Sequence, residues 1–105
     1  MTLRANKIFL VIRKEFMTTF ELEILNEKGL HARASAKFVE IVESFDASCE
    51  VRKNNTTVSG DSIMGLLMLS ASKDSVLKVK VSGPQKKELK SALQNLISKK
   101  FGEEN

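Results

Sequence analysis

The segment Gly29-Leu30-His31-Ala32-Arg33-Ala34-Ser35-Ala36 holds the only histidine of the chain. His31 follows a glycine turn and directly precedes a stretch with the apolar spacing of a helix. Its ring is therefore expected to lie beside the free N–H groups of the first helical turn, where an anion is stabilised. Arg33 adds a planar cation whose N–H groups suit phosphate oxygens. These residue types in this order favour a histidine that is phosphorylated within a ready-made phosphate site.

The chemistry of such a site makes separate demands on the ring and on its surroundings. One ring nitrogen must be unprotonated to act as nucleophile, and the other is then held as the N–H. The backbone N–H groups near Ala32 and Arg33, with the Arg33 guanidinium, would stabilise the charge of an in-line transition state. A cation at a helix start is mildly unfavourable against the helix dipole. A bound anion therefore explains Arg33 better than a solvated charge does. A surface or capping role is the alternative for His31.

A second segment, Gly60-Asp61-Ser62, precedes a short apolar run that is expected to be a helix. A serine at this point is an ordinary N-cap, worth roughly 1 kcal/mol. The same geometry would place a phosphate on Ser62 against the helix N-terminus, where it is stabilised. The carboxylate of Asp61 would repel that phosphate. Ser62 is thus a candidate regulatory phosphorylation site with a purely structural alternative.

The run that follows Ser62 is apolar nearly all round. A short surface helix cannot bury every side, so part of it should be exposed beside His31. Methionine-rich exposed surface suits docking to several partners in turn. Core packing is the alternative, and it suits Ile63, Leu66 and Leu69. Met64 and Leu67 are the leading candidates for partner contact, and the full candidate partner-binding set is Ile63, Met64, Leu67 and Met68.

Composition and charge narrow the class of protein. The chain has 105 residues, enough for one domain with a modest core, and 42% hydrophobic and 29% charged residues are ordinary for a globular protein. Residues 1–16 contain four cations and one anion, so most of the net charge of +4 lies there. The nearly neutral remainder argues against a nucleic-acid partner. The single Cys49 fits a cytoplasmic protein and a small buried side chain in a strand.

Other site chemistries find no support in the sequence. One histidine and one cysteine do not make a ligand cluster, so no metal is expected. A glycine-rich nucleotide loop is lacking, so no cofactor is expected and the phosphate must come from another protein. The protein would then be a carrier with a covalent intermediate and not a stand-alone catalyst.

The first residues form a separate question. Residues 1–17 are expected to be an N-terminal extension to a domain at 18–105. Its apolar run Ile8-Phe9-Leu10-Val11-Ile12 is too short for a signal peptide or a membrane span. An added strand or helical turn, a loose arm and a misassigned start, with Met17 as the true one, all remain open.

Hydrophobic patterning predicts the elements that position these residues. Alternation predicts strands at 19–25 and 75–81, and a hairpin of strands at 48–52 and 56–59 around an asparagine turn. Helical spacing predicts helices from Ala32 to about Ser44, at 63–69, and from Gln85 to about Phe101 with Gly102 as C-cap. The order βαββαβα favours an α+β open-faced sandwich, a four-stranded, mainly antiparallel sheet with three helices covering one face.

The chain resembles the HPr family, the histidine-containing phosphocarriers of the bacterial phosphotransferase system. Gly29-Leu30-His31-Ala32-Arg33 is similar to the family's active-site loop, and Asp61-Ser62-Ile63-Met64-Gly65-Leu66 to the segment around its regulatory serine. The element order and the spacing of the two motifs also agree, over about residues 18–101. Two positions depart from the family pattern: Ala34 stands where proline is common, and Asp61 where a basic or neutral polar residue is more usual.

The resemblance implies a function and a set of partners. His31 would be phosphorylated on Nδ1, the pros nitrogen, by enzyme I and would pass the group to an enzyme IIA domain during sugar transport. HPr kinase/phosphorylase is a further partner if Ser62 is regulatory. A cytoplasmic monomer without membrane insertion is expected. The alternative is a regulatory module, as in the nitrogen-related branch of the system, whose phosphorylation state controls a kinase or transcription partner.

Overall fold

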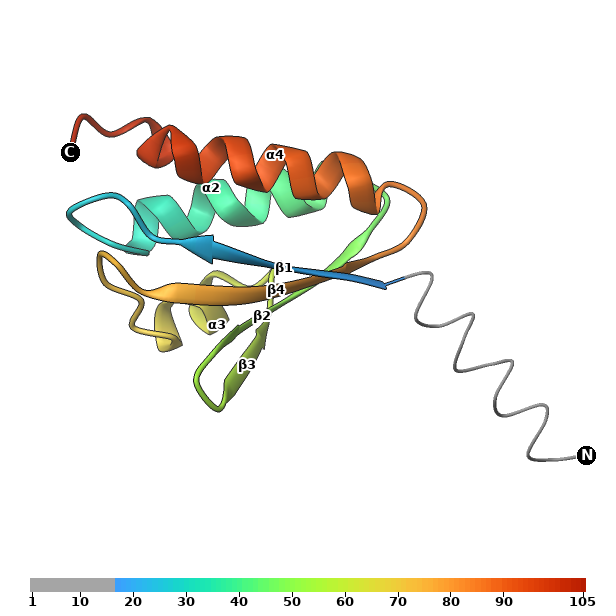
Figure 1. Ribbon diagram of the computed structural model, residues 1–105, viewed down its shortest axis with the longest axis horizontal. Coiled ribbons are helices and arrows are strands. Elements are labelled where there is room, and N and C mark those ends of the chain that lie inside the picture. Colours follow the sequence, from blue (N-terminus) through green and yellow to red (C-terminus); the bar gives the residue numbers. More distant parts are fainter. Residues whose placement is uncertain (1–16) are drawn as a thin grey trace, which may run out of the picture.

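The computed structural model describes residues 17–105 (Figure 1). Residues 1–16 of the extension predicted at 1–17, with its apolar run, lie outside the described residues. The first strand begins at Met17, one residue before the expected domain boundary. The elements follow the predicted order: β1 Met17–Glu23, α2 Ala32–Glu43, β2 Ser48–Lys53, β3 Thr56–Ser59, α3 Ile63–Met68, β4 Val76–Ser82, α4 Lys86–Ser98 and the short 3-10 turn η1 Lys100–Gly102.

The strands of residues 17–105 form one four-stranded sheet in the order β1-β4-β2-β3, with every neighbouring pair antiparallel. Strand β4 lies between β1 and β2, so that Phe20 pairs with Val79 on one side and Val51 with Val79 on the other. All three side chains are buried. The alternation of apolar and polar residues sets this register because a slip of one residue would turn every apolar side chain into solvent.

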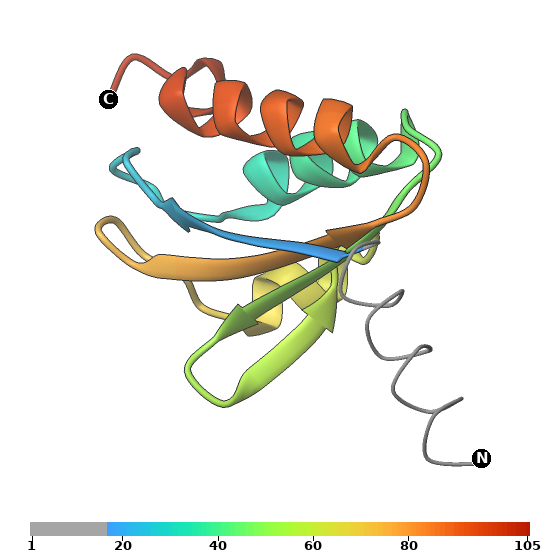
Figure 2. The same ribbon diagram turned by 45° about the vertical axis from the view of Figure 1, so that its right-hand side comes forward.

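The three α-helices within residues 17–105 cover one face of the sheet, as predicted. Helices α2 and α4 lie side by side over it in both views, and α3 packs against α2 and β3 (Figures 1 and 2). The core between these layers includes Phe20, Leu22, Phe38, Val51, Leu66, Leu77, Val79, Val81, Leu89 and Leu93.

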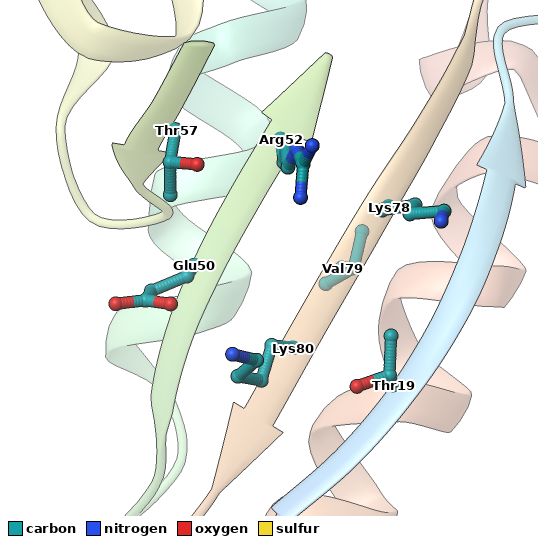
Figure 3. Close-up of a pocket in the computed structure, with 7 residues that line it drawn as sticks. All are labelled: Thr19, Glu50, Arg52, Thr57, Lys78, Val79 and Lys80. Carbon is teal, nitrogen blue, oxygen red and sulfur yellow. The ribbon is translucent and has the colours of Figure 1, made fainter. Parts of the chain in front are cut away.

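The other face of the sheet is open and polar. Figure 3 shows Arg52, Lys78 and Lys80 on that face, with the helices behind the strands. Glu50 lies opposite Lys80, and Glu21 opposite Lys78, in the strand register. A shallow hollow of about 280 Å³ on this face is lined in part by Glu50, Arg52, Lys78 and Lys80. Alternating charges on a solvated sheet face are ordinary, and this face is the one turned away from the helices.

The end of the last helix differs from the prediction. Helical spacing predicted a helix to about Phe101 capped by Gly102, but α4 ends at Ser98 with Lys99 as C-cap. Lys100 and Phe101 have φ of 54° and 56°, which stops the α-helix. The apolar Phe101 side chain continues the helical pattern in sequence, yet it reaches the core from the turn η1 and is 1% exposed.

The buried face of α2 also differs in detail. Helical spacing from Ala32 predicts an apolar face that includes Ala34, Phe38, Ile41 and Val42. Ala34, Phe38 and Val42 are buried, but Val39 is buried in place of Ile41. Ile41 and Phe45 are only partly buried against the core. The direction in which helical side chains lean decides between neighbouring apolar positions, and spacing alone does not.

Cys49 occupies the strand position expected for a small hydrophobic residue. Its side chain is buried in β2, and Gly60 packs so closely that an added Cβ would lie 2.5 Å from the Cys49 sulfur. Burial, with the nearby charges of Asp61 and Glu50, raises the pKa of the Cys49 thiol to about 12. The neutral thiol is a packing group.

No helix among residues 17–105 is long and apolar enough to cross a membrane.

Candidate functional site

The loop that carries His31 is fixed by close backbone contacts. The backbone N–H of Leu30 donates to the Ala71 carbonyl at 2.8 Å, which joins the loop to the segment after α3. Gly29 has φ of 68°, and an added Cβ would lie 2.5 Å from the Ala71 oxygen. Only glycine combines this left-handed conformation with so close an approach. The glycine before Leu30 and His31 is therefore a structural requirement of the loop.

His31 is the N-cap of α2, in an extended conformation with φ of −75° and ψ of −177°. Its carbonyl accepts from the Ser35 N–H at 2.8 Å and so begins the helix. Its side chain makes no capping hydrogen bond with the helix backbone. The N–H groups of Ala32, Arg33 and Ala34 have no intrahelical partner, since they belong to the first turn. The structure thus places His31 directly before the helical turn to which these three N–H groups belong.

The His31 ring is held from one side only. Its Nε2 atom lies 2.8 Å from a carboxylate oxygen of Glu103, and the two side chains are 29% and 20% exposed. A carboxylate accepts hydrogen bonds, so Nε2 carries the proton in this pair. Within residues 17–105 no hydrogen bond occupies Nδ1. In a neutral ring Nδ1 is then the unprotonated nitrogen, with its lone pair available as a nucleophile.

Asn26 supports this arrangement from beneath the loop. Its side-chain amide donates to the Gly29 carbonyl at 2.9 Å and to the Glu103 carboxylate at 3.2 Å. Asn26 is fully buried, and its Oδ1 has no hydrogen-bond partner. A buried amide that bonds two acceptors through its NH₂ group ties the loop backbone to the carboxylate. Asn26 therefore positions both the loop and the partner of His31.

The charge state of Glu103 follows from its neighbours. Partial burial on its own raises the pKa of this carboxyl group. The hydrogen bonds from His31 and Asn26, with the charges of His31 and Lys28, outweigh the burial and lower the pKa of Glu103 below its ordinary value. Glu103 is consequently an anion over the whole neutral range.

We expect the Glu103 carboxyl to titrate at a higher pH in a His31→Ala variant than in the wild type. The substitution removes a hydrogen bond and a charge that lower the pKa of Glu103, and it leaves the burial that raises it. Because the pKa of Glu103 is lower in the folded protein than in the unfolded chain, its ionisation stabilises the fold at pH values above the unfolded-state pKa. This stabilisation is lost as the pH falls through the folded-state pKa. Carboxyl ¹³C NMR titration measures the shift, and an unchanged midpoint would contradict the pairing.

Arg33 lies on the second residue of α2 with an exposed side chain. Among the described residues it makes no ion pair or side-chain hydrogen bond. The Arg33 guanidinium, two residues from His31 in the chain, is therefore exposed to solvent without a partner in the described part of the protein. Ala34, at the position where the family commonly has proline, is fully buried. Its N–H remains a third donor of the first turn, which a proline would remove.

Ser62 is the N-cap of α3, as predicted. Its hydroxyl accepts from the Gly65 N–H at 2.9 Å and is half-buried. The neighbouring Asp61 carboxylate accepts from the Ser59 hydroxyl at 2.5 Å. The structural role predicted for Ser62 is therefore present.

Helix α3 exposes a methionine-rich surface. Met64 and Met68 are 70% and 72% exposed, and Ile63 is 40% exposed. The suggested core role for Ile63 is therefore wrong, because Ile63 lies in the first turn, on the outer side of the helix. Leu66 and Leu69 are buried as predicted. Leu67 is only half-buried, so of the two leading contact candidates Met64 is the more exposed.

Potential metal ligands do not gather anywhere in the described part of the chain. No group of three or more histidine, cysteine, aspartate or glutamate side chains there is arranged to hold a metal ion.

Comparison with known proteins places this site in a family. The family model described as the PTS HPr component phosphorylation site matches residues 18–99. Phosphocarrier protein HPr of Neisseria meningitidis serogroup A is 45% identical over 82 residues, which cover 78% of this chain and 92% of the relative. The chain belongs to the HPr family, the phosphocarrier proteins of the phosphotransferase system.

Other members of the HPr family extend the comparison. The crystal structure of HPr-C-His from Thermoanaerobacter tengcongensis superposes with a TM-score of 0.80 at 40% identity, covering 84% of this chain and 99% of that one. Phosphocarrier protein NPr of Escherichia coli K12 is 34% identical, over 79% of this chain and 93% of the relative. The open-faced sandwich predicted from the sequence is thus the fold of the HPr family.

Sequence reasoning did not find two residues of this HPr-family site, Asn26 and Glu103. Asn26 lies in the turn before His31, and its burial is a tertiary property that the turn sequence does not reveal. Glu103 is separated from His31 by 72 positions. It follows Gly102 in a polar C-terminal segment, and nothing in that pattern signals contact with the histidine.

Proposed function

We propose that His31 accepts a phosphoryl group on Nδ1 from phosphoenolpyruvate-charged enzyme I and donates it to a histidine of an enzyme IIA domain. The observation that carries this proposal is the state of the ring. Nε2 is bound to the Glu103 carboxylate at 2.8 Å, and Nδ1 has no partner among the described residues. That is the ring state a nucleophilic histidine requires.

The surroundings of His31 suit the transfer step. The Nδ1 lone pair forms the bond to phosphorus while the bond between phosphorus and the donor's leaving atom breaks. The free N–H groups of the first turn, including that of Ala32, and the exposed Arg33 guanidinium would stabilise the phosphoryl oxygens. Onward transfer reverses the bond changes, and the electron pair of the P–N bond returns to Nδ1. The phosphohistidine keeps a high transfer potential, so the protein is an intermediate carrier.

The exposed surface of α3 is the proposed docking surface for these partners. Ile63, Met64 and Met68 are exposed, and Leu67 is half-buried beside them. The hydrogen bond from Leu30 to Ala71 joins the segment after α3 to the His31 loop. A small, flexible apolar surface next to the reactive group suits brief complexes with several proteins. We propose that the protein works as a cytoplasmic monomer.

Intact mass spectrometry after incubation with enzyme I and phosphoenolpyruvate tests the transfer. One added phosphate is expected. Acid should remove it, because a phosphoramidate is acid-labile, and in a separate sample the addition of an enzyme IIA domain should also remove it. Omission of enzyme I gives the control. Persistent absence of the phosphate, with an enzyme I from the same organism shown to be active, would contradict the carrier function.

Ser62 is proposed as a regulatory site for HPr kinase/phosphorylase. Its support is its place at the start of the docking helix, where a phosphate would alter partner binding. Incubation with the kinase and ATP should add one acid-stable phosphate to the wild type and none to Ser62→Ala. An unmodified wild type, alongside a positive-control HPr that is phosphorylated, would leave Ser62 with its N-cap role alone.

The second candidate function is regulation without sugar transport. The similarity to the Escherichia coli protein named NPr favours it. In this case the phosphorylation state of His31 would control a kinase or transcription partner. Transfer assays separate the two functions: rapid discharge to an enzyme IIA of a sugar permease supports transport, whereas discharge only to a soluble IIA-like protein supports regulation.

A further inference from the structure

The chain after α4 turns back toward the His31 loop and is called here the C-terminal strap, residues 100–105. Lys100, Phe101 and Gly102 have φ of 54°, 56° and 80°, and these consecutive left-handed residues reverse the chain. In both views the C-terminus lies at the same end of the molecule as the loop between β1 and α2 (Figures 1 and 2). Left-handed conformations are costly for residues other than glycine, so the strap must be held by compensating contacts.

Three contacts hold the strap in place. The Phe101 side chain is 1% exposed and packs in the core. Lys37 of α2 donates to the Phe101 carbonyl at 2.6 Å. The Glu27 N–H, in the loop before His31, donates to a backbone oxygen of Asn105 at 3.0 Å. Glu103 lies between the last two of these contacts, so both ends of its short segment are anchored.

The anchored segment delivers one carboxylate to the ring. Glu103 meets Nε2 of His31 at 2.8 Å and also accepts from the buried Asn26 amide. Lys28 is a further cation close enough to act on this carboxylate. The neighbouring Glu104 is exposed. A strap built only to cover the core would not need to place a charged side chain on the reactive residue.

We propose that Glu103 is a positioning residue for phosphoryl transfer, which the C-terminal strap holds against Nε2 so that Nδ1 is the nucleophile. This inference rests on the proposed function of His31. Carboxylates that bond the second nitrogen of a functional histidine fix its tautomer and orientation in other sites. Here the carboxylate comes from the far end of the chain.

The carboxylate has a second effect during the reaction. When Nδ1 forms its bond to phosphorus, the proton on Nε2 stays in place and the ring gains positive charge. The Glu103 anion lies against that charge and stabilises it. The donor's leaving atom takes the electron pair of the broken bond, and no proton has to leave the ring. Retaining the Nε2 proton also keeps the ring a good leaving group for the next transfer.

Histidine-selective ¹⁵N labelling tests this inference directly, because the chain has one histidine and therefore two labelled ring nitrogens. In the unphosphorylated wild type we expect an Nε2–H signal protected from solvent exchange and an unprotonated Nδ1. In Glu103→Ala the protected signal should be lost, and the fraction of the Nδ1–H tautomer should rise. Glu104→Ala, which removes the same charge one residue away, should leave both unchanged.

Kinetics provide the second measurement. Phosphoryl uptake from enzyme I should slow about tenfold in Glu103→Ala, mainly in kcat, with Glu103→Asp recovering part of the rate. Glu103→Gln removes the negative charge but retains a side-chain oxygen that can accept from Asn26 and so hold the strap in place. This variant therefore distinguishes the effect of the lost charge from the effect of a displaced strap.

Equal spectra for the wild type and Glu103→Ala, or equal effects of Glu103→Ala and Glu104→Ala, would overturn the inference. The spectra of the unphosphorylated protein decide the role of Glu103 even if enzyme I fails to phosphorylate it. Failure of the proposed function and failure of this inference are therefore distinguishable.

Discussion

Replacing His31 with alanine is expected to lower the rate of phosphoryl uptake from enzyme I and phosphoenolpyruvate by more than about a thousandfold, because the nucleophile is lost. The chain contains no second histidine. The free donors of the first turn of α2 and the Arg33 guanidinium can bind a phosphate oxygen, but neither provides a nucleophile. Intact mass spectrometry and a time course of phosphate incorporation measure the loss.

A matched surface substitution controls for this result. Lys80→Ala removes an exposed cation on the open face of the sheet, away from the helices (Figure 3). It should be phosphorylated at the wild-type rate. Acid-labile phosphate on His31→Ala at a comparable rate would show that another residue is the acceptor.

Replacing Phe101 with alanine is expected to lower the free energy of unfolding by about 3 to 5 kcal/mol, the usual cost of truncating a buried phenylalanine. Phe101 is 1% exposed and is the apolar anchor of the C-terminal strap. Without it, only the hydrogen bonds from Lys37 and Glu27 described above are left to offset the left-handed conformations at Lys100 and Phe101. Urea denaturation followed by circular dichroism measures the change.

The control for this substitution is Met68→Ala, which truncates a large apolar side chain that is 72% exposed. Its unfolding free energy should lie within about 0.5 kcal/mol of the wild type, because surface truncations remove little buried area. A loss below about 1 kcal/mol in Phe101→Ala would show that the strap is not anchored in the core.

Local sequence patterns were sufficient for the elements and for half of the site. Alternation along β1 and β4 predicted which side chains enter the core, and the asparagine turn predicted the β2–β3 hairpin. Gly29 and His31 predicted the start of α2 and therefore the position of the free backbone N–H groups in its first turn. These features depend on neighbours in the chain, which is why the sequence reveals them.

Features that depend on distant contacts were not predictable in the same way. Helix α4 was expected to continue to Phe101, because apolar spacing does not show that the backbone adopts a left-handed conformation at Lys100. Ile63 was considered for the core, yet the packing of α3 on α2 and β3 leaves it exposed. Glu103 reaches His31 only because the C-terminal strap folds back, and no local pattern encodes that contact.

The most direct test of the account is the position of phosphorus on the ring. The protein labelled with ¹⁵N-histidine, charged by enzyme I and phosphoenolpyruvate, would be examined by ¹⁵N and ³¹P NMR. We expect one phosphohistidine with ³¹P coupled to Nδ1 and with the proton retained on Nε2. Phosphorus on Nε2, the atom that is hydrogen-bonded to Glu103 in the structure, would contradict the account. A phosphorylated protein whose histidine carries no phosphorus would also contradict it.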